Sequence, residues 1–214
     1  MVSAAAPLQT DYTALAAAKY VKQTAEAVKE RGIHVEVVDA GAQALEKIKR
    51  LIPAGASVMT ASSQTLQQIG LEELLIARKH PWVNLKDELL AEKDMAKQLE
   101  LRKQSTLADY YLGSVHAIAR TGEIVVASGT GSQLPSYIFT SPNVIWVAGV
   151  QKIVPTLEDG LRRVREYSLP REDERMKSMG RLGSAIGKLL IFEHEAPFLG
   201  RNVTLILVNE RVGV

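Results

Sequence analysis

Two stretches of the chain are almost entirely apolar, and they constrain the fold more than any other feature. Residues 143–149 read NVIWVAG, and residues 203–208 read VTLILV. A strand with one face in water alternates polar and apolar side chains, whereas a strand that is buried on both faces is apolar throughout. Strands of the second kind occur in parallel sheets that are covered on both sides. The two stretches therefore predict an α/β fold with a buried parallel sheet.

Helix-forming segments separate the predicted strands along the whole chain. Apolar residues recur at helical spacing in residues 15–31 and 42–51, which are followed by the helix-ending residues Gly32 and Pro53. Because strand and helix alternate without a repeat or a clear linker, we expect one Rossmann-like domain with a mostly parallel sheet flanked by helices. Further strands are predicted at residues 34–38, 57–61, 107–113, 123–127 and 189–192, and further helices at 62–70, 114–120, 134–140 and 156–167.

Two segments stand apart from this alternation. Residues 1–10 are small and polar, and we expect a loose leader before the domain, which spans residues 11–214. Residues 71–105 are charged and helix-rich, with a break at His80 and Pro81. This segment is longer than a normal connection between two strands, so it is predicted to be a helical insertion or a lid.

The composition excludes several classes of protein. The 26 basic and 24 acidic residues leave a formal charge of +2, and neither sign forms a long run, so no nucleic-acid partner is expected. The sequence has no run of about 18 apolar residues and no recognisable signal sequence, which predicts a cytoplasmic protein without a membrane partner. The chain has no cysteine, which excludes a thiolate nucleophile and a cysteine-bound metal cluster within it.

No motif for a metal or a common cofactor is present. The four histidines have no spacing that would bring two of them onto one helical face. Gly129 and Gly131 resemble the start of a dinucleotide fingerprint, but Leu134 occupies the position of its third glycine or alanine. A phosphate-binding loop of the Gly-Lys-Ser or Gly-Lys-Thr kind is also missing. We therefore expect no metal and no cofactor.

Residues 121–133, TGEIVVASGTGSQ, contain the strongest local signal for ligand binding. An apolar strand runs into a turn with two glycines, which can adopt positive φ and let the backbone approach a ligand. Ser132 could cap a following helix, whose free N–H groups attract negative charge. An ordinary glycine-bearing turn is the alternative. On the first interpretation, the anion-binding residues are Gly129, Thr130, Gly131, Ser132 and Gln133.

Further candidate residues follow the predicted strands. In open α/β sheets, ligands bind beyond the carboxyl ends of the strands, where the loops after each strand meet. Helix capping is the alternative role for the hydroxyl groups in these loops, and a surface salt bridge is the alternative for the lysine. Because these loops meet at one edge of the sheet, we expect a shared rim formed by the loops at residues 60–65, 112–116, 128–133 and 149–152. Its ligand contacts should come from Thr60, Ser62, Ser63 and Lys152.

Two residues are candidates for acid–base catalysis. His116 follows a predicted strand and could reach the rim as an acid or a base, with a polar surface position as the alternative. Glu123 is the candidate carboxylate, although it begins its strand and would lie at the opposite end of a parallel sheet. The alternative for Glu123 is a surface carboxylate that is solvated by water and has no catalytic role.

Three blocks of the sequence resemble the LUD family, named for lactate utilization. They read SVMTASSQTLQQIGL, LADYYLGSVHAIARTGEIVVASGTGSQLPSYI and VIWVAGVQKIVPTLEDGLRRVREY, and the resemblance covers residues 14–210. The resemblance is greater to stand-alone LUD family members than to members with an iron–sulfur extension. The resemblance implies a fold similar to that of glucosamine-phosphate deaminases, ribose-phosphate isomerases and CoA-transferases, with ligand-binding loops at residues 60–65 and 128–133. The chain departs from the family at Glu123, where many members have threonine, and at Ala61, where it lacks a glycine-rich turn.

The family is associated with the oxidation of lactate to pyruvate by a multi-protein system. The leading hypothesis is therefore a protein of lactate or related organic-acid utilization that binds a small anionic metabolite at the glycine-loop rim. If it is an enzyme, metal-independent isomerase or acyl- or CoA-transferase chemistry fits its residues. Two alternatives stay open: a non-catalytic subunit that supports an iron–sulfur partner protein, and a metabolite sensor. A homo-oligomer is compatible with each of them.

Overall fold

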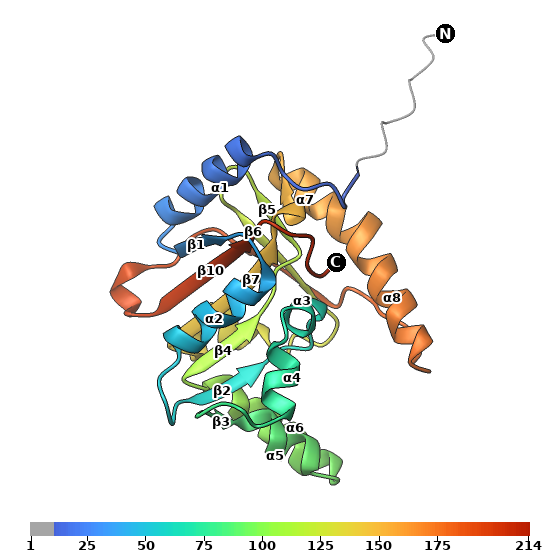
Figure 1. Cartoon of the computed structure of the whole chain (residues 1–214). Coiled ribbons are helices and arrows are strands. Elements are labelled where there is room, and N and C mark those ends of the chain that lie inside the picture. The colour runs from blue at the N-terminus through green and yellow to red at the C-terminus, as the bar shows by residue number, and fades with distance from the viewer. Residues whose placement is uncertain (1–10) are drawn as a thin grey trace.

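A six-stranded parallel sheet forms the centre of the structure, a computed structural model that describes residues 11–214 (Figure 1). All of its neighbouring strands run parallel, which confirms the predicted α/β class. The predicted leader at residues 1–10 lies outside the described residues. Across the sheet the order is β1 (His34–Val38), β10 (Asn202–Val208), β7 (Asn143–Gly149), β4 (Tyr110–Gly113), β2 (Ser57–Thr60) and β3 (Val83–Asn84).

The two apolar stretches of the sequence are neighbouring strands of this sheet. β7 and β10 pair from Asn143 with Asn202 to Gly149 with Val208. After the first residue, every residue of both strands is buried. Successive side chains point to opposite faces of a sheet, so these strands supply apolar side chains to a core on each side. Because both faces of β7 and β10 are buried, polar and apolar residues do not alternate along these two strands.

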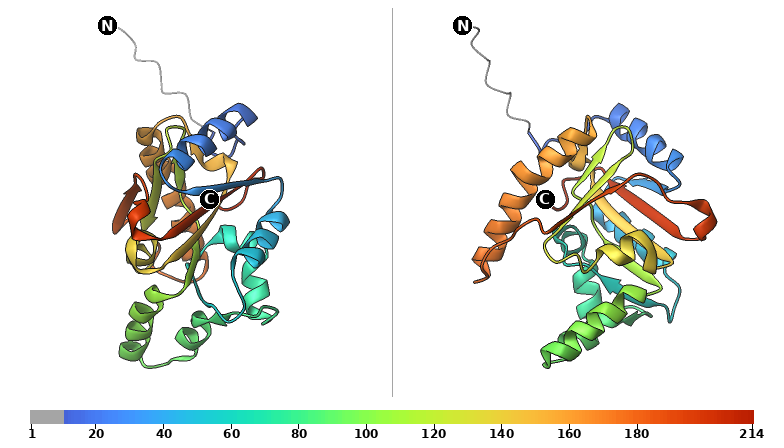
Figure 2. Two further views of the ribbon diagram at one scale, coloured as in Figure 1. Left: turned by 90° about the vertical axis from the view of Figure 1, so that its left-hand side faces the viewer. Right: turned by 180° about the vertical axis from the view of Figure 1, so that it is seen from behind.

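Helices cover one face of the main sheet. They are α2 (Gly41–Leu51), α3 (Gln64–Gln68) and α4 (Leu71–Ile76), and their apolar side chains pack with those of β7 and β10. The other face packs against α1 (Ala18–Glu30), α5 (Leu85–Ala91) and a second sheet. The views in Figure 2 show this layered arrangement, with the helical segment at residues 157–178 on the outside.

The second sheet has four strands in the order β8 (Ile153–Val154), β5 (Ala117–Ala119), β6 (Ile124–Ser128) and β9 (Lys188–Phe192). β6 runs antiparallel to both of its neighbours, and β5 is parallel to β8. The outer face of this sheet packs against α7 (Leu157–Arg163). The strand predicted at residues 123–127 is therefore present, but it does not belong to the parallel sheet.

The prediction of a helix at residues 114–120 is wrong, because this segment contains β5. Ala117, Ile118 and Ala119 are fully buried between the main sheet and α7. Their backbone pairs with β6 and β8, and Gly122 closes the turn to β6 with a φ of +99°. The helix propensity of alanine is a weak preference, and strand pairing in a buried position overrides it.

The segment predicted as a helical insertion contains α4, β3, α5 and α6 (Met95–Gln104). β3 pairs with β2 at the edge of the main sheet, and Leu89 of α5 is part of the core. The segment is thus partly built into the main fold, and its movement as a lid stays a prediction. None of the described helices is both long and apolar enough to cross a membrane.

The capped helix predicted at residues 156–167 begins where expected. Thr156 Oγ1 accepts a hydrogen bond from the Asp159 N–H at 3.2 Å. After α7 the helix widens into a π-helical turn (Val164–Ser168) and continues as α8 (Leu169–Ser178), beyond its predicted end. A second π-helical turn (Ser136–Thr140) lies in the helix predicted at residues 134–140.

Candidate functional site

The polar residues predicted in loop 60–65 follow β2 at the carboxyl edge of the main sheet. Thr60 ends the strand and is buried, whereas Ser62 is exposed. Ser63 caps α3, because its Oγ accepts a hydrogen bond from the Leu66 N–H at 3.3 Å. The structure therefore shows the capping role that the sequence left as an alternative for Ser63. Ligand binding by these residues stays a prediction.

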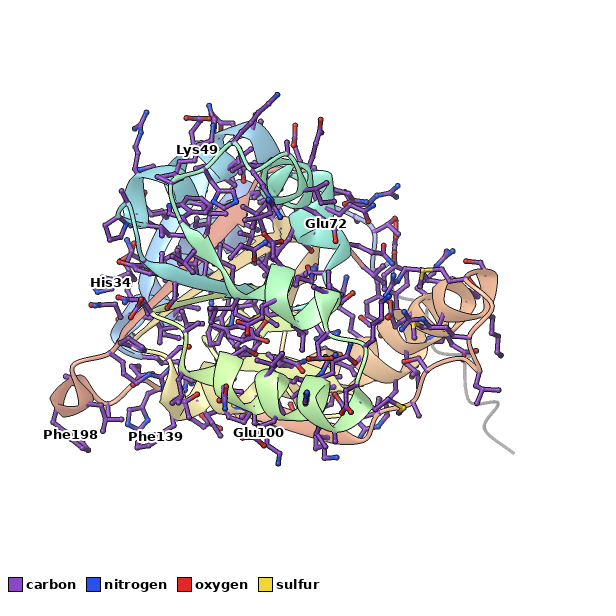
Figure 3. The ribbon with its side chains drawn as sticks, turned by 90° about the horizontal axis from the view of Figure 1, so that it is seen from below. His34, Lys49, Glu72, Glu100, Phe139 and Phe198 are labelled. Atoms are coloured by element: carbon purple, nitrogen blue, oxygen red, sulfur yellow. The ribbon has the colours of Figure 1, made fainter. Side chains whose placement is uncertain are left out.

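A pocket of about 100 Å³ opens beside Thr60 and Ser63. Five aliphatic side chains from α3, α4 and α5 form most of its wall, and Glu72 of α4, which is labelled in Figure 3, is part of the lining. Such a lining suits a small ligand with an apolar part and few polar groups. The lining residues are Thr60, Ala61, Ser63, Leu66, Leu71, Glu72, Leu75, Ile76, Asn84, Lys86, Asp87 and Leu90.

Lys86 supplies the positive charge of this pocket. Its Nζ donates a hydrogen bond to Thr60 Oγ1 at 3.2 Å, and no carboxylate of residues 11–214 is within ion-pair distance of it. Burial lowers the pKa of Lys86 from its usual 10.5, although the negative charge of Glu72 opposes this shift. A partly buried ammonium group without a carboxylate partner favours the binding of an anion.

Sequence reasoning missed Lys86 because it lies in the segment interpreted as an insertion. One signal was present in the sequence, because asparagine is a common N-cap residue and Asn84 lies two positions before Lys86. In the structure, Asn84 Oδ1 accepts a hydrogen bond from the Lys86 N–H at 3.3 Å, so Asn84 caps α5. Such a cap indicates that a helix starts beside β3. The sequence does not show that this helix turns back toward the end of β2.

Lys152 lies at the same edge of the sheet but is deeply buried. Its side chain follows β7, and its Nζ donates to Thr65 Oγ1 at 3.1 Å, Ser114 Oγ at 3.0 Å and the Val115 carbonyl oxygen at 3.1 Å. When Lys152 is protonated, these three bonds use all three hydrogens of its ammonium group. The loops at residues 60–65, 112–116 and 149–152 therefore do meet. Lys152 has no free donor for an anion in this arrangement.

His116 lies directly before β5 rather than on a helix. Its Nδ1 accepts a hydrogen bond from the Ala127 N–H at 3.1 Å, so the proton of the neutral ring resides on Nε2. Arg163 Nη1 donates to the His116 carbonyl oxygen. Burial, together with the charges of Lys152 and Arg163, lowers the pKa of His116 from 6.5 to about 3. A ring with this pKa is a weak base at neutral pH, and its Nε2–H is a hydrogen-bond donor.

The low pKa of His116 predicts a loss of stability in acid. The folded-state value of about 3 is below the unfolded-state value of 6.5, so the unfolded chain binds more protons between these two pH values. The free energy of unfolding should therefore fall as the pH drops from 6.5 toward 3. We expect His116→Gln to reduce this dependence in urea unfolding measured over that range. His34→Gln, at an exposed position, is the control and should keep the wild-type dependence.

The glycine loop follows β6 and is connected to the rim through His116, which binds the Ala127 N–H two residues before Gly129. Gly131 has a φ of +84°, and a Cβ there would come within 2.9 Å of Lys188 Cδ. The Gly131 N–H donates to Ser128 Oγ at 2.8 Å, and the Ser132 N–H donates to Thr130 Oγ1 at 3.3 Å.

Two main-chain donors of the glycine loop are therefore satisfied within the loop. Gln133 also has an internal role, because its Oε1 accepts a hydrogen bond from Ser128 Oγ at 2.9 Å. The side chain of Ser132 does not cap the following helix. None of residues 129–133 lines the pocket beside Thr60. Their binding of an anion stays a prediction, and the contacts favour the alternative of an ordinary turn.

Glu123 lies at the β5–β6 turn, away from the other candidates. Arg31 Nη2 is 2.5 Å from Glu123 Oε1, and Thr121 Oγ1 donates to the other carboxylate oxygen. Burial alone would raise the pKa of Glu123, but the hydrogen bond from Thr121 and the charge of Arg31 outweigh it, so the pKa is lowered. The contacts of Glu123 thus hold α1 to the second sheet, and the structure does not bring Glu123 to the rim.

The family is settled by comparison with known proteins. The sequence model of the LUD domain matches residues 21–188. This chain belongs to the LUD domain family. The resemblance found in the three sequence blocks is therefore confirmed. A search of curated proteins finds no match.

One solved structure has a similar fold over nearly the whole chain. A DUF162 family protein from Deinococcus radiodurans has a TM-score of 0.55 and 16% sequence identity, over 92% of this chain and 100% of that one. The eIF2B beta subunit from Chaetomium thermophilum has a TM-score of 0.36 and 15% identity, over 57% of this chain and 45% of that one. At these identities the likeness to the DUF162 protein concerns the fold alone.

Two polar centres of this LUD domain lie at the carboxyl edge of the main sheet, and they include only some of the candidate residues. Thr60, Ser63 and Lys86 line the open pocket. Thr65 of α3, Ser114 and Lys152 form a separate hydrogen-bonded cluster. Among residues 11–214, no three His, Asp or Glu side chains gather as a metal site requires.

Proposed function

We propose that this LUD-family protein binds a small aliphatic organic acid in the pocket beside Thr60, as part of lactate or related organic-acid utilization. The observation that carries the proposal is the ammonium group of Lys86, which contacts Thr60 in a small apolar pocket and has no carboxylate partner among the described residues. The carboxylate of the ligand would take the place of that partner. Thr60, Ser63 and Asn84 supply the polar groups that a hydroxyl or keto oxygen needs.

The size and the lining of the pocket favour a hydroxy- or keto-acid over larger anions. A volume of about 100 Å³ is below the roughly 300–1,000 Å³ that drug-sized ligands occupy, and a CoA ester exceeds that size. The hydroxyl groups of a sugar phosphate would lie against leucine and isoleucine side chains without hydrogen-bond partners, which costs free energy. A short aliphatic acid fits both the volume and the wall.

The charges around the pocket favour a ligand with one negative charge. Lys86 is the cation, whereas Glu72 and Asp87 are acidic residues of the same lining. A second negative charge on the ligand would be repelled by these carboxylates. Monocarboxylates such as lactate and pyruvate are therefore better candidates than phosphates or dicarboxylates.

Replacing Lys86 by methionine should weaken binding of the acid by about 10- to 100-fold, because a hydrogen bond to a charged group contributes roughly 1.5–3 kcal/mol. Isothermal titration calorimetry with lactate and with pyruvate measures this change. Lys97→Met is the matched control, since Lys97 is exposed on α6 and does not line the pocket. Equal affinities of the wild-type protein and Lys86→Met, or no binding of either acid, would contradict the proposal.

Turnover by the isolated chain distinguishes an enzyme from a metabolite sensor. A sensor should bind the acid without forming a product, whereas an enzyme should convert it. Incubation of the purified protein with the acid, followed by mass spectrometry of the small molecules, separates the two functions. Unchanged acid in the presence of measurable binding would favour the sensor.

One observation favours the second candidate function, a subunit that docks on an iron–sulfur protein. Two of the three phenylalanines, Phe139 and Phe198, are 66% and 88% exposed, and Figure 3 shows them on one side of the molecule. Arg201, which follows Phe198, connects this segment to the π-helical turn with Phe139 by donating to the Ser136 and Tyr137 carbonyl oxygens. Exposed aromatic groups of this kind mark protein interfaces. The variant Phe139→Ser/Phe198→Ser should abolish co-elution with such a partner in size-exclusion chromatography, and unchanged co-elution would exclude this surface.

A further inference from the structure

The cluster of Lys152, Ser114 and Thr65 has a geometry that the proposed organic-acid pocket does not explain. Lys152 Nζ is 3.0 Å from Ser114 Oγ and 3.1 Å from Thr65 Oγ1. The two hydroxyl oxygens are themselves 3.1 Å apart. A lysine amine and two hydroxyl groups therefore form a closed triangle, with members from α3 and from the segments that follow β4 and β7.

The charge of this cluster is not balanced by any acidic residue of the described chain. Lys152 is 2% exposed and Thr65 is 1% exposed, and Lys152 has no salt bridge among residues 11–214. Buried lysines without a carboxylate partner are rare in proteins, because an ammonium group is costly to remove from water. Burial and the nearby charge of Arg163 lower the pKa of Lys152 well below its usual value. The neutral amine, which is a proton acceptor, is thereby favoured.

The end of the chain shields the amine further. Gln151 Nε2 donates to the Val212 carbonyl oxygen at 2.9 Å, and the Gly213 N–H donates to Gln68 Oε1 at 2.6 Å. A Cβ at Gly213 would be 2.0 Å from Thr65 Oγ1 and 3.0 Å from Lys152 Nζ. Residues 212 and 213 thus pack directly over Lys152 and Thr65. In Figure 1 the C-terminal end lies beside α3.

Ser114 differs from the other two members because it is partly exposed. It directly follows β4 at the carboxyl edge of the sheet, which is where ligands of open α/β sheets bind. In the resting arrangement its hydroxyl donates to the Val147 carbonyl oxygen at 2.7 Å. Rotation about the Cβ–Oγ bond turns the same proton toward Lys152 Nζ. Ser114 is thus the least buried member of the cluster.

We propose that Ser114 and Lys152 form a serine–lysine nucleophilic pair that accepts an acyl group from an ester or thioester. Serine–lysine pairs are an established variant of the serine–histidine arrangement, in which the base removes the proton of the hydroxyl group. Thr65 is a positioning residue, because it holds the amine without access to solvent. The proposal is independent of the pocket beside Lys86.

The reaction balances with the groups that are present and water. Ser114 Oγ forms a bond to the acyl carbon while its proton moves to Lys152 Nζ, and the bond from the acyl carbon to the alcohol or thiol breaks. Lys152 then returns the proton to this leaving group. In the second half, water gives one proton to Nζ and bonds to the acyl carbon, and Ser114 Oγ leaves with the proton from Nζ. The products are a carboxylic acid and an alcohol or thiol.

Labelling with a fluorophosphonate tests the pair in the purified full chain. We expect one adduct, located on Ser114 by peptide mass spectrometry, and hydrolysis of p-nitrophenyl acetate that this adduct blocks. Ser114→Ala should abolish the adduct, and Lys152→Met should slow its formation by about 100-fold or more. Ser178→Ala, on the exposed part of α8, should label as the wild type does. Absence of the adduct in the folded wild-type protein would overturn the proposal, and so would an equal labelling rate in Lys152→Met.

A second measurement keeps the proposal testable whatever the stability of Lys152→Met. The chain has no cysteine, so Ser114→Cys introduces a single thiol. Its alkylation by iodoacetamide should rise with a midpoint below the usual thiol pKa of about 8.5, because Lys152 favours the thiolate. Adding Thr65→Val or Lys152→Met should move this midpoint upward. A midpoint that stays the same in both double variants would overturn the pairing of residue 114 with Lys152.

Discussion

Replacing Trp146 by alanine is expected to lower the free energy of unfolding by about 3–5 kcal/mol, the range found when large aromatic side chains are removed from a core. Trp146 is fully buried in β7. Its ring makes edge contacts with Tyr137 at 5.3 Å and with Phe192 at 5.2 Å between ring centroids. Since Phe192 belongs to β9, Trp146 joins the two sheets, and its loss leaves a cavity between them. Urea unfolding followed by circular dichroism measures the effect.

Trp146→Phe is the matched control for this prediction. It keeps an aromatic ring for both edge contacts, and it removes the indole Nε1–H, which is buried without a hydrogen-bond partner among the described residues. We therefore expect a distinctly smaller loss than for alanine. If Trp146→Ala cost less than about 1 kcal/mol, the packing between the two sheets would not stabilise the protein as described.

The second large effect is expected for Glu195. Its replacement by alanine should lower the free energy of unfolding by about 3–5 kcal/mol. Glu195 and Arg201 form an ion pair at 3.6 Å, and their side chains are only 4% and 5% exposed. Arg201 also donates to the Ser141 and Tyr137 carbonyl oxygens at 3.1 Å and 2.9 Å. Glu195→Ala leaves a buried guanidinium group without its carboxylate, and thermal or urea unfolding should show the loss.

An exposed ion pair provides the comparison. Glu193 is paired with Arg31 at 3.0 Å, but its side chain is 60% exposed, so Glu193→Ala should cost less than about 1 kcal/mol. The double variant Glu195→Ala/Arg201→Met removes both buried charges and should recover part of the stability. A double variant that is as unstable as the sum of its two single variants would show that the two residues do not act as a pair.

Much of the architecture could be predicted from local patterns. β1, β7 and the helix that Thr156 caps agree with the sequence expectations, because runs of β-branched residues and capping residues act over short distances. The LUD family was also recognisable from the three sequence blocks. The failure at residues 114–120 has a physical cause: β5 has only three residues, Ala117–Ala119, and its partners β6 and β8 are brought to it by the folded chain.

The candidate site could be predicted only in part. The positions of the hydroxyl groups after β2 and of the lysine after β7 agree with the sequence, because both follow a strand at its carboxyl end; their contacts with a ligand stay a prediction. Lys86 was missed, since its approach to Thr60 depends on how α5 packs against β2. The internal contacts of the glycine loop could not be predicted, because hydrogen bonds such as that from the Gly131 N–H to Ser128 Oγ cannot be read from a motif.

The amino-acid sequence alone determined the fold class, the family and the set of polar residues at the carboxyl ends of the strands, because each rests on periodicity or on the order of residues along the chain. The tertiary structure decided which of those residues are in contact, which are buried and which have a partner of opposite charge. Lys152 and Lys86 both lie at the rim, but one is enclosed by residues 212 and 213 and the other lines an open pocket. That difference arises from packing between segments that are far apart in the sequence, on which local patterns have no influence.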